Sequence, residues 1–318
     1  MNAPTNHKTP AAVSVHGLRK AYGEKVVLDG VDLTIAEGEV FALLGPNGAG
    51  KTTIVRILST LIPAGAGTAT VMGYDLRGEA GAVRGVIGVT GQFSAVDDLL
   101  TGEENLLLMG SLLHLPATVR RARASDLLER FDLVEAARQT PATYSGGMTR
   151  RLDLAMTLMG RPRLVFLDEP TTGLDPRSRQ TMWQIIRELV HEGVTILLTT
   201  QYLEEADHLA DRIAMLDHGR IVAEGPPEEL KRRTPGAHIQ LHFADAASLA
   251  EAERALPEGT RDDKEMVLRV PTERGIRSLR DVLARLDEVA VDDLSIHRPD
   301  LDDVFFAVTG SPSKGMNQ

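Results

Sequence analysis

The apolar positions along the chain first form a short continuous run and then take on helical spacing. Residues 40–44 are all apolar and lie between Gly38 and Gly45. After the glycine-rich stretch 45–50, apolar residues recur at positions 54, 55, 57, 58, 61 and 62. This pattern predicts a strand, a glycine loop and a helix in direct succession.

The same alternation of element types returns further along the chain. Residues 164–167 and 195–200 form short runs rich in apolar and β-branched residues, as is typical of strands covered on both faces. Between them, apolar residues recur with helical spacing over 182–190, and Gly193 can end that helix. Strands that alternate with helices predict an α/β domain with a parallel sheet.

Two other regions depart from this pattern. Residues from about 95 to 160 show helical spacing without strand signals and predict a helical insertion in the sheet domain. A charged stretch with Pro235 and Gly236 predicts a domain boundary near residue 235, so the main domain spans 13–235. Beyond the boundary, the pattern predicts a small α+β domain over 236–310, with strands at 239–243, 266–270 and 294–297 and helices at 246–256 and 276–286.

The composition limits the function classes. The chain has 318 residues, of which 42% are hydrophobic and 25% are charged, and this composition is typical of a folded protein. We expect a flexible leader at 1–12 and a disordered tail at 311–318. A net charge of -10 argues against nucleic-acid binding, and the absence of cysteine excludes disulfides and thiolate metal sites. No apolar stretch is long enough to cross a membrane, so we expect any membrane role to involve docking to another protein.

The strongest chemical motif follows the first predicted strand. The stretch Gly45–Thr52 reads GPNGAGKT and fits the phosphate-loop pattern G-x-x-x-x-G-K-[ST] between a strand and a helix. Backbone N–H groups of such a loop converge on phosphates, the lysine contacts the β and γ phosphates, and the threonine hydroxyl ligates Mg²⁺. An ordinary glycine turn is the alternative. The predicted ATP-binding residues are Gly45, Pro46, Asn47, Gly48, Ala49, Gly50, Lys51, Thr52 and Thr53.

Two carboxylates end the predicted strand 164–167. Beside a phosphate loop, Asp168 could organise Mg²⁺ through water, and Glu169 could accept a proton from an attacking water. Two solvated carboxylates at the end of a strand are the alternative. Ser145, Gly146 and Gly147 precede another helical pattern and could form a second anion site, although such a triplet is more typical of a helix cap or turn.

Taken together, these motifs resemble the P-loop NTPase domains of ABC transporter ATP-binding subunits, from about Val13 to Gly225. The resemblance implies that Ser145–Gly147 is the signature motif, which completes the ATP site of the opposite protomer in a homodimer. It also implies that Tyr22 stacks on adenine, that Gln92 contacts Mg²⁺ and couples to the membrane partner, and that Asp175 belongs to a loop at the dimer interface.

One position departs from the family pattern. The family normally has a histidine after the strand at 195–200, whereas this chain has Gln201, which can donate a hydrogen bond to phosphate but cannot carry a positive charge. This glutamine and the segment 296–310 resemble the drug-resistance exporter branch, the daunorubicin-resistance-type ATPases. From spacing alone, the apolar residues Leu301, Val304, Phe305 and Val308 predict one buried helix face.

The resemblance implies a function in transport. The chain is expected to bind and hydrolyse ATP with Mg²⁺, with Glu169, Lys51 and Gln201 as catalytic residues, and to power export of a hydrophobic compound or drug. The resemblance also implies a separate polytopic permease as partner and a location at the cytoplasmic face of the membrane. Three alternatives remain: a nucleotide-gated module with weak hydrolysis, a soluble ABC ATPase acting on ribosomes or DNA, and import instead of export.

Overall fold

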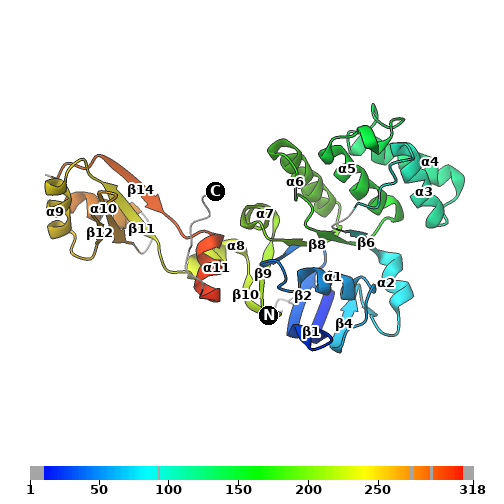
Figure 1. Ribbon diagram of the computed structural model, residues 1–318, viewed down its shortest axis with the longest axis horizontal. Helices are drawn as coiled ribbons and strands as arrows, with labels where there is room; N and C mark the ends of the chain where they lie inside the picture. Colours follow the sequence, from blue (N-terminus) through cyan, green and yellow to red (C-terminus); the bar gives the residue numbers. More distant parts are fainter. Residues whose placement is uncertain (1–10, 92–93, 273–275, 287–288, 311–318) are drawn as a thin grey trace, which may run out of the picture. The chain divides into compact units, whose positions relative to one another are not determined.

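The computed structural model describes residues 11–91, 94–272, 276–286 and 289–310 (Figure 1). The chain divides into two compact units, one up to Pro227 and one from Glu228 onward. The sequence pattern suggested a division near residue 235. The structure instead assigns most of helix α8 (Pro227–Arg233) to the second unit, because a charged stretch can continue a helix as readily as it forms a linker.

The first unit is built around a six-stranded sheet in the order β10-β9-β3-β8-β7-β6. The five strands from β9 to β6 are parallel, and β10 pairs with β9 in antiparallel fashion. All residues of β3, β7 and β8 are buried, which explains the apolar runs that these strands contain. The predicted parallel sheet is confirmed. The strands are β3 (Val40–Leu44), β6 (Ile87–Thr90), β7 (Leu164–Asp168), β8 (Thr195–Thr200), β9 (Arg212–Asp217) and β10 (Arg220–Gly225).

Helices follow three of these strands. They are α1 (Lys51–Leu58), α6 (Pro176–His191) and α7 (Leu203–Leu209). The expectation that α1 continues through positions 61 and 62 is wrong, because the chain turns at Thr60 with a φ of 63° and leaves Leu61 67% exposed. At the end of α6, Gly193 lies one residue beyond the C-cap with a φ of 89°, a conformation that favours glycine.

An antiparallel sheet, which the sequence pattern did not predict, joins the same unit in the order β2-β1-β4-β5. Its inner residues share one core with Phe41 of β3 and Phe166 of β7. The expected flexible leader at 1–12 is wrong for Ala11 and Ala12, which belong to β1, while residues 1–10 lie outside the described part. The elements are β1 (Ala11–Tyr22), β2 (Lys25–Ala36), β4 (Ala66–Val71), β5 (Tyr74–Asp75) and the short helix α2 (Ala80–Val86).

A helical subdomain occupies the stretch expected to be a helical insertion. It contains α3 (Gly102–Leu112), α4 (Ala117–Arg130) and α5 (Gly146–Thr157), with single 3₁₀ turns at Pro141–Thr143 and Leu158–Gly160. Helix α3 begins with a reciprocal capping box between Thr101 and Glu104, and Figure 1 shows the three helices grouped together. Within the described ranges, no helix has the length and apolar character needed to cross a membrane.

The second unit contains an antiparallel sheet in the order β12-β13-β11-β14 and a separate apolar core. The expected strands and helices are present, and the additional strand β12 was not expected. In the last helix, Leu301 and Val304 are buried, whereas Val308 is 38% exposed, so the predicted buried face is only partly right. The expected tail at 311–318 lies outside the described residues. The elements are β11 (His238–His242), α9 (Ala246–Ala255), β12 (Thr260–Asp262), β13 (Val267–Pro271), α10 (Ile276–Arg285), β14 (Asp293–His297) and α11 (Leu301–Thr309).

Candidate nucleotide site

The candidate site lies at the carboxyl ends of adjacent parallel strands. Strands β3, β8, β7 and β6 are direct neighbours in the sheet, so the residues that follow them meet at one edge. Gly45 follows β3, Gln201 follows β8, and Glu169 follows β7. The Gly45 N–H donates to the carbonyl of Thr200 at 3.4 Å, which ties the first of these ends to the second.

The glycine loop encloses the lysine that follows it. Lys51 Nζ donates to the carbonyl oxygens of Gly45 at 2.6 Å and Pro46 at 3.1 Å. Burial lowers the pKa of Lys51, and the nearby carboxylates of Glu169 and Asp168 partly oppose this effect. A cavity of about 320 Å³ opens beside the loop; its lining residues are Lys25, Val27, Asn47, Gly48, Gly50, Lys51, Thr52, Thr53 and Glu169.

Two of the loop glycines are required by the geometry. A Cβ on Gly45 would lie 2.2 Å from the backbone oxygen of Leu216, closer than any real contact. Gly50 has a φ of 115°, and a Cβ there would lie 2.7 Å from Leu28 Cδ2. The loop therefore packs tightly against β2 and β9, which leaves its other side free to face the cavity.

Oxygen atoms suited to a hard cation meet near the start of α1. Thr52 Oγ1 donates to Asp168 Oδ1 at 3.3 Å, and Thr199 Oγ1 donates to the same oxygen. Hydroxyl and carboxylate oxygens are ligands that Mg²⁺ accepts, with water completing its coordination, so the donor set fits this ion. Gln92, the other predicted Mg²⁺ contact, lies outside the described residues.

Glu169 extends this group of oxygens into the cavity. Its backbone has a φ of 50°, a left-handed conformation that is uncommon outside glycine. Its N–H donates to both the carbonyl and the hydroxyl of Thr199, at 3.1 and 3.2 Å, and its carboxylate accepts from Thr172 Oγ1 at 3.3 Å. A carboxylate that lines the cavity beside Lys51 can accept a proton from a water held there.

Other predicted binding residues are not among those lining this cavity. Ser145 is the exposed N-cap of α5 and accepts from the Met148 N–H at 3.3 Å. Gly146 is exposed, and a Cβ on Gly147 would lie 2.4 Å from Ser178 Oγ of helix α6. The starts of α5 and α6 are thus close together. Asp175, the N-cap of α6, accepts from Ser178, and these hydrogen bonds lower its pKa.

Tyr22 and Gln201 have few contacts. Tyr22 is 48% exposed and pairs across the β1–β2 hairpin with Lys25, which itself lines the cavity. Gln201 is half-buried, and its side chain forms no hydrogen bond with any residue that the structure describes. The Lys20 ammonium lies 5.4 Å from the centre of the Tyr22 ring.

Several residues of the site were missed by the sequence reasoning. Lys25 and Val27 line the cavity, but they come from a hairpin that was not predicted. Thr199 lies directly opposite Asp168 in the β7–β8 register, and Arg150 of α5 contacts the segment around Glu169. Thr199 could be identified as a site residue only from the pairing of β7 with β8, which places it opposite Asp168.

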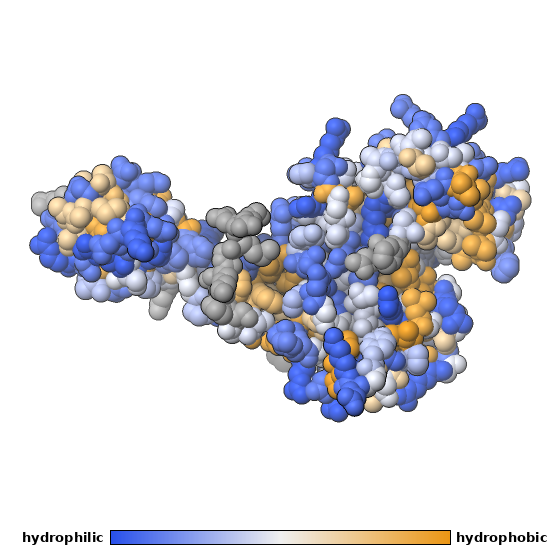
Figure 2. All heavy atoms as spheres, in the orientation of Figure 1, coloured by the Kyte–Doolittle hydropathy of each residue, from blue (hydrophilic) through white to orange (hydrophobic). Residues whose placement is uncertain are grey.

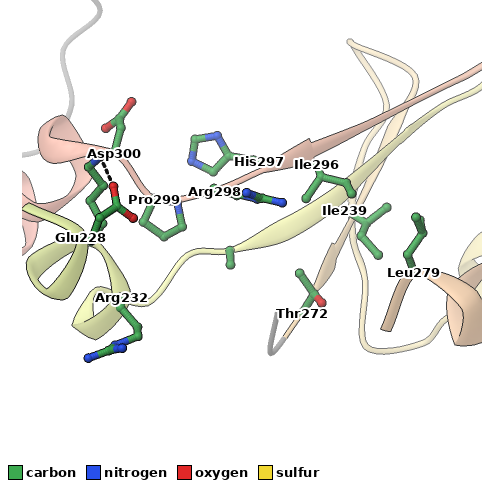
Figure 3. Close-up of a pocket in the computed structure, with 12 residues that line it drawn as sticks. Glu228, Arg232, Ile239, Thr272, Leu279, Ile296, His297, Arg298, Pro299 and Asp300 are labelled. Carbon is green, nitrogen blue, oxygen red and sulfur yellow. Dashed lines mark hydrogen bonds and ion pairs between the residues drawn. The ribbon is translucent and has the colours of Figure 1, made fainter. Parts of the chain in front are cut away.

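A separate cavity of about 690 Å³ lies within the second unit (Figure 3). Its lining combines apolar residues such as Ile239, Leu279 and Ile296 with the charged groups of Arg298 and Asp300. It contains none of the residues predicted to bind nucleotide. Cations and anions both line it, so its charges favour no single class of ligand.

Comparisons with known proteins agree with this geometry. The family model described as ABC transporter matches residues 28–172. The chain is 50% identical to daunorubicin resistance ATP-binding protein DrrA3 of Streptomyces coeruleorubidus, over 94% of this chain and 96% of that protein. It is 39% identical to Nod factor export ATP-binding protein I of Ralstonia nicotianae, over 94% of each chain.

The fold also matches a solved structure. A dimeric ATP-binding cassette in a post-hydrolysis state, bound to ADP and Pi, superposes with a TM-score of 0.62 at 28% identity. The match covers 67% of this chain and 98% of the solved one. The chain therefore belongs to the ATP-binding proteins of ABC transporters, in the branch that includes the daunorubicin-resistance ATP-binding proteins.

Proposed function

We propose that this protein binds and hydrolyses ATP to power export of a hydrophobic compound through a separate membrane permease. The observation that carries the proposal is the convergence of Lys51, Thr52 and Glu169 on one cavity, with Asp168 bonded to Thr52. Backbone N–H groups of the loop and the Lys51 ammonium bind the phosphates of ATP. Thr52 and Asp168 would hold Mg²⁺, which supplies positive charge to the phosphate oxygens.

Hydrolysis in this proposal depends mainly on charge and position. Lys51 offsets negative charge that builds up on the transferring phosphoryl group, while Glu169 orients a water and removes its proton. Gln201 follows the neighbouring strand β8, and its side-chain amide donates a hydrogen bond to the γ phosphate. Tyr22 stacks on the adenine from the edge of the hairpin.

A homodimer would complete each ATP site. Ser145 and Gly146 are exposed at the start of α5, where the first N–H groups of a helix have no partner within the helix, and Asp175 is exposed at the start of α6. These features suit contact with ATP bound to a second protomer, as does the dimeric state of the solved cassette. Because ATP would then contact both protomers, it favours the closed dimer, and hydrolysis weakens that state.

The permease would dock on the helical subdomain. Figure 2 shows apolar surface over the region of α3 and α4. Leu108 is 42% exposed, Leu112 is 64% exposed, and Val119 is 47% exposed. Exposed apolar groups gathered in one region commonly mark a protein interface. Gln92 would link this surface to the ATP site, at the cytoplasmic face of the membrane.

Export of a hydrophobic compound is supported by the relatives. One is named for resistance to daunorubicin, and another for export of Nod factor. The test is to tag the protein, solubilise native membranes gently with Mg²⁺-ATP and identify the proteins that copurify. We expect a polytopic membrane protein in about equal amount. Recovery with ribosomes or DNA, or without any membrane protein, would contradict the transport assignment.

Gln201 supports a second candidate function, a nucleotide-gated module with weak hydrolysis. An amide cannot carry the positive charge that a histidine offers a phosphate. If the export assignment is right, we expect the purified parent to hydrolyse ATP, and Gln201→His to change turnover by less than about tenfold, which is roughly 1.4 kcal/mol. A parent with almost no turnover and a strongly active Gln201→His variant would instead favour the module. Steady-state phosphate release distinguishes the two.

A further inference from the structure

Arg150 in the signature helix α5 makes an unusual set of contacts. Nε donates to the carbonyl of Pro170 at 3.0 Å, and Nη1 donates to the carbonyl of Gly91 at 2.9 Å and to Asp153 Oδ2 at 3.2 Å. Nη2 donates to the carbonyl of Asp168 at 3.1 Å and, more weakly, to that of Glu169 at 3.4 Å. A guanidinium has five N–H donors, and all five have a partner here.

Three of these contacts are with Glu169, the proposed catalytic base, and with the residues directly before and after it. The carbonyls of Asp168, Glu169 and Pro170 are consecutive, and Glu169 in the middle has the left-handed φ of 50°. A left-handed backbone conformation of a residue other than glycine costs free energy, so contacts with neighbouring groups must maintain it. The N–H of Glu169 is fixed by Thr199 on one side, and the carbonyls are fixed by Arg150 on the other.

The same helix also binds Gly91 and Ala95, which follow strand β6. Arg150 binds the carbonyl of Gly91, and Asp153 Oδ1 accepts from the N–H of Ala95 at 3.2 Å. The side chain of Asp153 is only 3% exposed, and that of Arg150 is 12% exposed. Burial raises the pKa of Asp153, and the Arg150 guanidinium opposes this shift. Arg150 and Asp153 therefore connect helix α5 to Gly91 and Ala95 and to the backbone of residues 168–170, and both side chains are largely shielded from water.

We propose that Arg150 is a positioning residue for hydrolysis, which holds the backbone around Glu169 so that its carboxylate faces the γ phosphate. This inference rests on the proposed ATPase function. Because Arg150 lies five residues after Ser145, a shift of α5 on contact with a second protomer would move Glu169, Gly91 and Ala95 together. The side chain of Arg150 thus links the signature helix α5 to the catalytic base Glu169.

The test replaces the guanidinium while keeping its charge. In Arg150→Lys, three donors on a single nitrogen cannot reach five separate acceptors. We expect kcat for ATP to fall about 10- to 100-fold, as a small misplacement of a catalytic group does, with Kd for a fluorescent ATP analogue within about twofold of the parent. Hydrogen exchange should become faster at the backbone amides within residues 169–172, namely those of Glu169, Thr171 and Thr172, since Pro170 has no amide hydrogen.

A matched control is available in α4. Arg123 also donates to a backbone carbonyl, that of Leu158 at 3.1 Å, and pairs with an aspartate three residues later, and its side chain is 18% exposed. Arg123→Lys should therefore reproduce the general cost of replacing a half-buried arginine and leave kcat and exchange at 169–172 unchanged. If Arg150→Lys does not fold, Asp153→Asn provides a milder variant that should lower kcat with unchanged Kd.

Two results would overturn the proposal. One is a kcat for Arg150→Lys within twofold of the parent. The other is equal losses of kcat, nucleotide affinity and thermal stability, which would indicate a purely structural role. A parent protein without any turnover would instead refute the ATPase function. In that case the hydrogen exchange of Arg150→Lys at residues 169–172 tests the positioning role by itself. Exchange faster than in the parent supports the role, and unchanged exchange rejects it.

Discussion

Glu169→Gln is expected to reduce ATP turnover by about 100-fold or more while leaving ATP binding intact, since a general base contributes roughly 10²–10⁴-fold to the rate. The amide is nearly the same size as the carboxylate and can still accept from Thr172 Oγ1, so the φ of 50° and the local fold should persist. What the substitution removes is the ability to accept a proton from the attacking water. Steady-state phosphate release measures the loss.

The same variant should accumulate as a dimer with Mg²⁺-ATP. Because ATP would contact both protomers and would no longer be hydrolysed, the closed state should persist, and gel filtration would detect it. Glu204→Gln is a suitable control, because Glu204 lies on α7, pairs with Arg179 at 3.4 Å and is exposed. Unchanged turnover in Glu169→Gln would refute the role assigned to Glu169.

Lys51→Met should abolish nucleotide binding with little loss of stability. Lys51 is 5% exposed, and its ammonium donates to the carbonyls of Gly45 and Pro46 beside the cavity. We expect ATP affinity to fall at least about 100-fold, or roughly 3 kcal/mol, since removing one partner of a buried charge pair has an effect of this order. Titration with a fluorescent ATP analogue checks the affinity.

The stability of this variant separates a binding effect from unfolding. Methionine has a similar length and carries no charge, so burying it costs no desolvation of an ion, and thermal unfolding should shift only slightly. Lys264→Met in an exposed turn of the second unit is the control for loss of one charge. Parent-like affinity in Lys51→Met would show that this cavity is not where the phosphates bind.

The predictable part of the site was its local part. The phosphate loop could be recognised because a strand, a glycine loop and a helix are consecutive in sequence, and Asp168 and Glu169 because they end an apolar run. The antiparallel sheet could not be recognised from this pattern. Its strands β1 and β2 show irregular burial with several register shifts, so they give no simple alternation. Lys25 and Val27 were missed with that hairpin.

The sequence by itself determined the parallel α/β architecture, the phosphate loop, the two carboxylates and the departure at Gln201, because each depends on residues close together in the chain. Only the tertiary structure decided the contacts that join them. Thr199 meets Asp168 because β8 lies between β3 and β7, and Arg150 reaches Gly91, Asp168, Glu169 and Pro170 because α5 packs where β6 and β7 end. Strand order and helix packing arise from burial of distant apolar residues against each other, and no local spacing records them.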